Sequence, residues 1–91
     1  MPLISVIIPS YNSAELIAET IKSVQNQTFT DWEIIVVDDG STDNTQQIVE
    51  DIILTDSRIK YFFVANNGVS SARNYGVDQA KSEFIAFFRF R

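Results

Sequence analysis

The chain has 91 residues, with seven Lys and Arg against twelve Asp and Glu, which gives a formal net charge of −5. This length supports one small domain, residues 1–91, and the scattered basic residues of an acidic chain make nucleic acid a poor partner. Because the chain has no Cys and no His, disulfides, thiolate chemistry, zinc fingers and any catalytic triad with an imidazole base are excluded.

Apolar strands and amphipathic helices alternate along the chain. The β-branched run over 3–8 predicts a buried strand. A first helix is expected to follow, capped by Asn12 or Ser13, with Glu15 completing a capping box. The remaining expected elements are, in order, a strand over 32–37, a helix capped at Ser41 or Thr42, a strand over 59–65, a helix over 69–80 and a strand over 84–88.

This alternation predicts an α/β fold, a three-layer α/β/α Rossmann-like parallel sheet of about four strands and three helices. The longest wholly apolar run, over 84–88, is far shorter than the roughly 18 residues that a membrane span needs. Since no basic segment of a signal peptide follows Met1, the sequence predicts a cytoplasmic domain without a membrane span.

Three polar loops follow the first three predicted strands, over 9–12, 38–41 and 66–68. In parallel sheets ligands bind beyond the carboxyl ends of the strands, so these loops should converge on one site. An aromatic side chain there can stack on a nucleotide base, carboxylates can accept from an imide or a ribose hydroxyl, and hydroxyls or a guanidinium can bind phosphate. The residues that offer these groups are Tyr11, Asp38, Asp39, Ser70, Ser71 and Arg73.

Each of these residues also has a purely structural interpretation. Tyr11 could cover the core, the Asp-Gly-Ser segment could form only a turn and a helix cap, and Arg73 could pair with Asp38 or Asp39. Three such loops at one edge favour a ligand site. The chain contains neither a Gly-x-Gly-x-x-Gly fingerprint nor a Gly-Lys-Ser/Thr phosphate loop, which makes the usual NAD and ATP sites improbable.

Three segments together resemble the amino-terminal half of a family 2 glycosyltransferase with the GT-A fold. They are SVIIPSYN over 5–12, QTF over 27–29 followed by WEIIVVDDGS over 32–41, and NGVSSARNYG over 67–76. The resemblance implies the strand order 3-2-1-4. It also implies binding of the nucleoside diphosphate of an activated sugar, often a UDP-sugar. The parent enzyme would transfer that sugar to a polysaccharide or lipid-linked acceptor.

The resemblance assigns nucleotide-binding roles to particular residues and no catalytic residue. Tyr11 would pack on the base, Asp39 would contact the base edge, and Arg73 would lie near the base or diphosphate. The full expected set is Pro9, Ser10, Tyr11, Asp39 and Arg73, supported by Asn12, Asp38 and Gly68.

The sequence departs from the family pattern after its last predicted strand. Family members carry Asp-x-Asp there, which holds the Mn or Mg ion that bridges the diphosphate. This chain has Arg89-Phe90-Arg91 instead, so we expect no metal or other cofactor on it and no transfer by it alone; the cation belongs to an intact parent only. A single inserted base converts codons for Phe-Phe-Asp-Ser-Asp-Asp into Phe-Phe-Arg-Phe-Arg-stop, and sequencing the coding DNA tests this hypothesis of a frameshifted or truncated enzyme.

The last predicted strand should expose Phe84, Phe87, Phe88 and Phe90 on an unpaired edge, which predicts a homodimer or higher oligomer.

Two alternatives to an enzyme fragment remain open. The chain could be a nucleotide-binding or self-associating remnant, or a receiver-like signalling domain. The receiver is disfavoured because its acidic pair follows the first strand, whereas here the pair follows the second.

Overall fold

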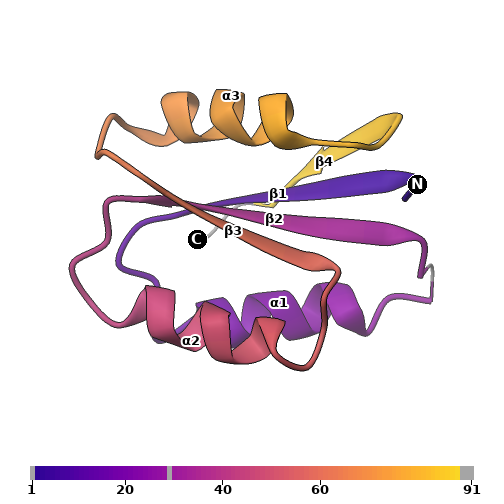
Figure 1. Cartoon of the computed structure of the whole chain (residues 1–91), viewed down its shortest axis with the longest axis horizontal. Helices are drawn as coiled ribbons and strands as arrows, with labels where there is room; N and C mark the ends of the chain where they lie inside the picture. Colours follow the sequence, from indigo (N-terminus) through magenta and orange to yellow (C-terminus); the bar gives the residue numbers. More distant parts are fainter. Residues whose placement is uncertain (1, 29, 89–91) are drawn as a thin grey trace.

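The structure, a computed structural model, describes residues 2–28 and 30–88 (Figure 1). Its elements are β1 (Ile4–Ser10), α1 (Ile17–Gln25), β2 (Trp32–Asp39), α2 (Thr45–Ile53), β3 (Ile59–Val64), α3 (Val69–Gln79) and β4 (Phe84–Phe87). The strands form one parallel sheet in the order β3-β2-β1-β4. The predicted fold class and strand order are both confirmed.

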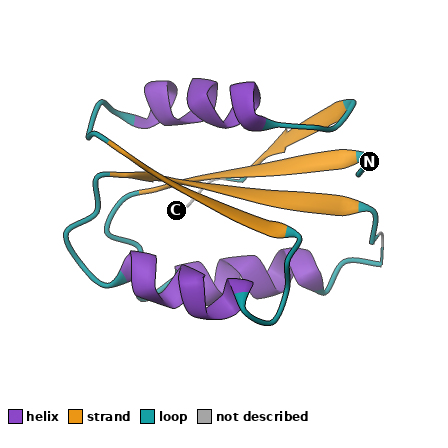
Figure 2. Cartoon of the chain, viewed as in Figure 1, coloured by secondary structure: helices purple, strands orange, loops and turns teal. Residues whose placement is uncertain are grey.

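Helices cover both faces of the sheet (Figure 2). Helices α1 and α2 lie together on one face and α3 lies alone on the other, so the molecule has three layers. Strand β2 is buried along its whole length, which explains its continuous apolar sequence. This arrangement brings the carboxyl ends of β1, β2 and β3 to the same edge of the sheet.

Alternation of side chains along the strands divides the interior into two cores of unequal size. We call them the large core, between the sheet and α1 and α2, and the small core, between the sheet and α3. The buried residues of the large core are Ile8, Ile17, Ile21, Val24, Trp32, Ile34, Val36, Val49 and Ile59. Those of the small core are Ile7, Ile35, Val37 and Ala72.

Helix α3 packs closely against β1 at Gly76. A Cβ atom at this position would lie 2.6 Å from Cγ2 of Ile7 and 3.3 Å from Cγ2 of Val37. Real side chains do not approach so closely, so the absence of a side chain at Gly76 sets the distance between α3 and the sheet.

The predicted start of the first helix is wrong. Helix α1 begins at Ile17, after a turn in which the backbone N–H groups of Leu16 and Ile17 donate to the carbonyl oxygen of Ser13. No side chain caps the helix, so neither Asn12 nor Ser13 forms the expected capping box with Glu15. The reason is that the Asn12 side chain is already used, because its Oδ1 accepts hydrogen bonds from the loop that precedes α2.

The predicted start of the second helix is also wrong. Helix α2 begins at Thr45 instead of following directly on Ser41 or Thr42. The side chain of Asp43 orders the intervening turn, since its Oδ1 accepts from the backbone N–H and the hydroxyl of Thr45. Ser41 instead remains in the loop, where its backbone N–H donates to Asp38.

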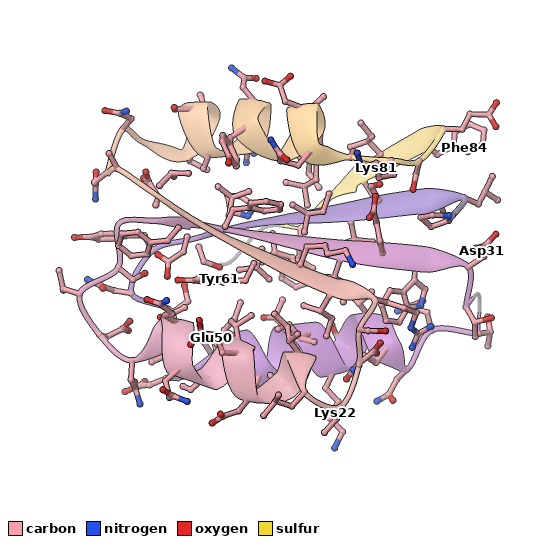
Figure 3. All side chains as sticks on the ribbon, in the orientation of Figure 1. Lys22, Asp31, Glu50, Tyr61, Lys81 and Phe84 are labelled. Carbon is pink, nitrogen blue, oxygen red and sulfur yellow. The ribbon has the colours of Figure 1, made fainter. Side chains whose placement is uncertain are left out.

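Strand β4 is short, and its apolar side chains are accessible on both faces. The exposed fractions of Phe84, Ile85 and Phe87 are 56%, 38% and 49%. Phe84 lies at the end of the sheet away from the loops described above (Figure 3). Phe88 was expected to be exposed, but it is partly buried against the large core. The expectation for Phe90 falls outside the described residues.

None of the described helices is long and apolar enough to cross a membrane.

Candidate functional site

A pocket of about 490 Å³ lies where the carboxyl ends of β1 and β2 meet the beginning of α3. Its lining residues are Pro9, Ser10, Tyr11, Asp39, Asn66, Val69 and Ala72. The three loops predicted to converge therefore do meet, and four of the sequence-predicted residues line one cavity. Its volume is in the range of small-molecule sites, and its wall combines apolar surface with a few polar groups.

Asp39 is the most firmly held polar group of this pocket. Its carboxylate oxygens accept from the backbone N–H of Asn67 at 2.9 Å and from that of Gly68 at 3.0 Å. The side chain is 6% exposed. Gly68 has a φ of 96°, which a glycine adopts without strain. Since each carboxylate oxygen has two lone pairs, Asp39 retains acceptor capacity for a ligand.

Asp38 and Asp39 point to opposite faces of the sheet because they are consecutive residues of a strand. Asp38 lies on the face of α1 and α2, fully buried, and it does not line the pocket. Its carboxylate accepts from the backbone N–H of Ser41 at 2.8 Å and from the Tyr61 hydroxyl at 2.5 Å. Asp38 therefore holds the start of the loop at Ser41 through this hydrogen bond, and the supporting role expected from the sequence stays a prediction.

Tyr61 comes from β3 and reaches Asp38 from beneath the sheet, on the side of α2 (Figure 3). Burial, together with the hydrogen bond to the Asp38 carboxylate, raises the pKa of the Tyr61 hydroxyl well above its usual range. The phenol therefore keeps its proton and acts as a donor. Tyr61 is not among the residues predicted from the sequence, although its position two residues after Ile59 places its side chain on the face of the large core.

Asn12 joins the first loop to the second. Its Oδ1 accepts from the backbone N–H groups of Thr42 at 2.8 Å and Asp43 at 3.3 Å, and its own N–H donates to Oγ of Ser41 at 2.8 Å. Asn12 has a φ of 48°, in the left-handed region that asparagine tolerates better than most residues. Asn12 thus bridges the two loops, and its supporting role in nucleotide binding stays a prediction.

Two side chains present unused groups at the pocket. Tyr11 is 51% exposed. Its ring therefore does not form a buried cover over the core, which was the alternative to a ligand-binding role for this residue. Ser10 is 2% exposed and its Oγ has no hydrogen-bond partner within the described part of the chain. A buried hydroxyl without a partner is costly, and a ligand that bonds to it would remove that cost.

Arg73 is the one nucleotide-binding candidate that the structure does not bring into the pocket wall. It lies on α3 beside β4, with its guanidinium carbon 5.9 Å from the centroid of the Phe87 ring. Its Nε is buried and has no partner among residues 2–28 and 30–88. The alternative of an ion pair with Asp38 or Asp39 is not seen there, because both carboxylates accept from other groups.

The described residues do not fit a divalent cation. No group of three or more His, Cys, Asp or Glu side chains comes together in 2–28 and 30–88, and the two adjacent aspartates diverge to opposite faces. The segment that departs from the Asp-x-Asp pattern, Arg89 to Arg91, lies outside the described residues.

Comparison with known proteins identifies relatives of this fold and sequence. The model of the family "Glycosyl transferase family 2" matches residues 5–88. A beta-1,3-glucosyltransferase of Campylobacter jejuni that acts on GalNAc(5)-diNAcBac-PP-undecaprenol is 47% identical over 89 residues, covering 96% of this chain and 29% of that protein.

Solved structures agree with the sequence match. S. aureus TarS (residues 1–349) superposes with a TM-score of 0.86 at 38% identity, covering 94% of this chain and 26% of that 1–349 chain. TarS has also been solved in complex with UDP, with a TM-score of 0.81, 37% identity and the same coverage of both chains. The mannosyltransferase PcManGT from Pyrobaculum calidifontis, solved with GDP-Man and Mn²⁺, has a TM-score of 0.81 at 30% identity over 92% of this chain and 26% of that one.

These matches confirm the family resemblance and the GT-A type of fold. They also argue against a receiver-like signalling domain, because the glycosyltransferase family model matches residues 5–88, which include all three loops. The chain spans less than a third of the length of these relatives.

Proposed function

This chain belongs to glycosyl transferase family 2, and we propose that its pocket binds the nucleoside diphosphate part of a nucleotide-sugar. Uridine diphosphate is the first ligand to test, since TarS was solved with UDP. The observation that carries the proposal is the pocket itself, where a fixed carboxylate, an unpartnered buried hydroxyl and an exposed aromatic ring face one cavity.

Each lining group suits one part of such a ligand. The Tyr11 ring can stack on the base, Asp39 can accept from an imide N–H at the base edge, and the Ser10 hydroxyl can bond to a polar base atom or to the ribose. A desolvated carboxylate acceptor favours a ligand that presents a donor to it, because a ligand without one would leave the carboxylate without compensation. Arg73 and the first turn of α3 would supply positive charge near the diphosphate.

We propose further that these residues bind the donor nucleotide without completing sugar transfer. Metal ions stabilise the leaving diphosphate in enzymes that use them. The described residues offer no set of carboxylates for that ion, so the proposal for this chain is metal-independent binding. In this proposal a longer parent enzyme transfers the sugar, at the cytoplasmic face of a membrane. Its acceptor is a polysaccharide or a lipid-linked molecule.

Titration of the chain with UDP, with and without Mn²⁺, tests the proposed function. Backbone amide shifts in a ¹⁵N-labelled sample are expected to change for Ser10, Asn67 and Gly68, and the affinity is expected to be the same with and without Mn²⁺. Uridine alone should bind more weakly if the diphosphate contributes. Saturating UDP that leaves these three amides unshifted would refute the proposal.

We also propose that the isolated chain self-associates through β4, with a second copy of the chain as the partner. Strand β4 pairs with β1 along one edge, and its accessible side chains are uncharged. Antiparallel pairing of two β4 strands centred on Ala86 would place Ile85 of one copy opposite Phe87 of the other, an apolar pair on the same face. The contact is therefore self-complementary, as a two-fold interface requires.

Light scattering across the micromolar range measures this association. The wild-type chain is expected to show a dimer mass at high concentration, and Ile85→Lys is expected to return it to a monomer because the pairing would bury two lysines. Phe63→Lys is the matched control, since Phe63 is 54% exposed on the opposite edge strand and should leave the mass unchanged. A monomeric mass for the wild type at all concentrations would overturn the proposal.

A further inference from the structure

A continuous series of hydrogen bonds runs from the edge strand β3 to the loop that carries Tyr11. The Tyr61 hydroxyl donates to Oδ2 of Asp38, and Oδ1 of the same carboxylate accepts from the backbone N–H of Ser41. Oγ of Ser41 in turn accepts from the backbone N–H of Asn12, with the two atoms 2.8 Å apart. The N–H of Thr42 donates back to Oδ1 of Asn12, also at 2.8 Å.

The first member of this series is anchored in the large core. The Tyr61 ring is partly buried and packs against that core, and Tyr61 is paired with Val36 in the register of β2 and β3. The ring therefore stays in place if the loops move, and its hydroxyl holds the buried Asp38 carboxylate in a fixed position. The negative charges of Glu50 and Asp43 add to burial and to Asp38 in raising the pKa of Tyr61, which favours the neutral phenol as a donor.

The last member of the series determines the path of the chain beside the pocket. Asn12 has its φ of 48° held from two sides, through its own N–H and through its side-chain oxygen. A non-glycine residue in this conformation persists only where its surroundings hold it there. Tyr11 immediately precedes Asn12, so the direction of its exposed ring depends on that backbone conformation.

We propose that Tyr61 is a positioning residue for the nucleotide pocket, acting through Asp38, Ser41 and Asn12 to orient Tyr11. The inference rests on the proposed function, because it is the bound nucleotide that would sense the orientation of Tyr11. Tyr61 itself does not line the pocket. It fixes the loops from the opposite face of the sheet.

Tyr61→Phe isolates the hydroxyl, because the ring and its packing are retained. It leaves the fully buried Asp38 carboxylate with the Ser41 N–H as its remaining donor within the described chain. Tyr75→Phe is the matched control, since it removes a phenol hydroxyl from α3 for which the structure shows no hydrogen bond, while its ring contact with Phe62 remains.

Two measurements are made on each variant, the dissociation constant for UDP and the rates of backbone amide hydrogen exchange. Loss of a hydrogen bond to a charged group predicts exchange about tenfold faster for the amides of Asn12, Ser41 and Thr42 in Tyr61→Phe, and exchange at the wild-type rate in Tyr75→Phe. The dissociation constant for UDP is expected to rise about fivefold or more in Tyr61→Phe and to stay at the wild-type value in Tyr75→Phe.

Wild-type exchange and affinity in Tyr61→Phe would overturn the inference. Faster exchange in Tyr61→Phe with the wild-type affinity for UDP would also overturn it, since that result indicates a loss of stability that does not reach the pocket. Should the wild-type chain itself fail to bind UDP, the proposed function fails. The exchange rates would then still show whether Tyr61 orders the two loops, and unchanged loop amides would refute the positioning role.

Discussion

Asp39→Asn is expected to weaken UDP binding by about tenfold or more. The carboxylate accepts from two backbone N–H groups, those of Asn67 and Gly68, one on each oxygen. An amide of the same size can accept through its single oxygen, and its NH₂ group would face one of these donors. The variant therefore loses the charged acceptor for the ligand and also one of the bonds that hold the loop before α3. Isothermal titration with UDP measures the change.

Asp51→Asn serves as the control for the change in net charge. Asp51 lies on the exposed side of α2 and, within residues 2–28 and 30–88, accepts only from the Gln47 side chain, so the variant should bind UDP as the wild type does. Equal affinity of Asp39→Asn and the wild type would show that the ligand does not use this carboxylate. A loss of affinity in both variants would indicate a long-range effect of charge.

Gly76→Ala is expected to destabilise the fold by about 1–3 kcal/mol, the usual cost of overpacking a core. In an exposed helix interior the same change would stabilise by about 0.5–1 kcal/mol, because alanine has the better helix propensity. The sign is reversed here because the new methyl group would lie 2.6 Å from Cγ2 of Ile7, a fully buried side chain. The midpoint of urea unfolding measures the difference.

Asn74→Ala tests whether α3 responds to alanine in general. Asn74 is exposed on the same helix, so alanine there should leave the midpoint unchanged or raise it slightly. If Gly76→Ala also raised the midpoint, the close approach of α3 to β1 would not limit the packing of the small core.

The strands could be predicted from the sequence because burial on both faces requires continuous apolar runs, as in β2. The starts of α1 and α2 could not be predicted in this way. Asn12 has the right side chain and spacing for a cap, yet a side chain that can cap its own helix can also bond to a distant loop. Asn12 bonds to a loop 30 residues away in the sequence, and nothing local in the sequence distinguishes the two outcomes.

The site was predicted at the level of loops and less well at the level of single side chains. Alternation along β2 separates Asp38 from Asp39, and this could have been derived from the spacing to the buried Val36 and Val37. The place of Arg73 beside Phe87 could not, because it depends on how far α3 lies from β4. Tyr61 could not be singled out for a different reason, since a tyrosine at a core-facing position is usually explained by packing alone.

The two cores become complete at different stages of protein synthesis. All buried residues of the large core lie before residue 60, whereas the small core also needs Ala72 of α3. Chains emerge from the ribosome at roughly 5–20 residues per second and can fold as they emerge. A nascent chain that has just released β3 can therefore bury one face of its sheet while Ile7, Ile35 and Val37 remain uncovered. During that interval the uncovered apolar face is the kind of surface that promotes aggregation and that chaperones cover, on the side where the pocket later forms.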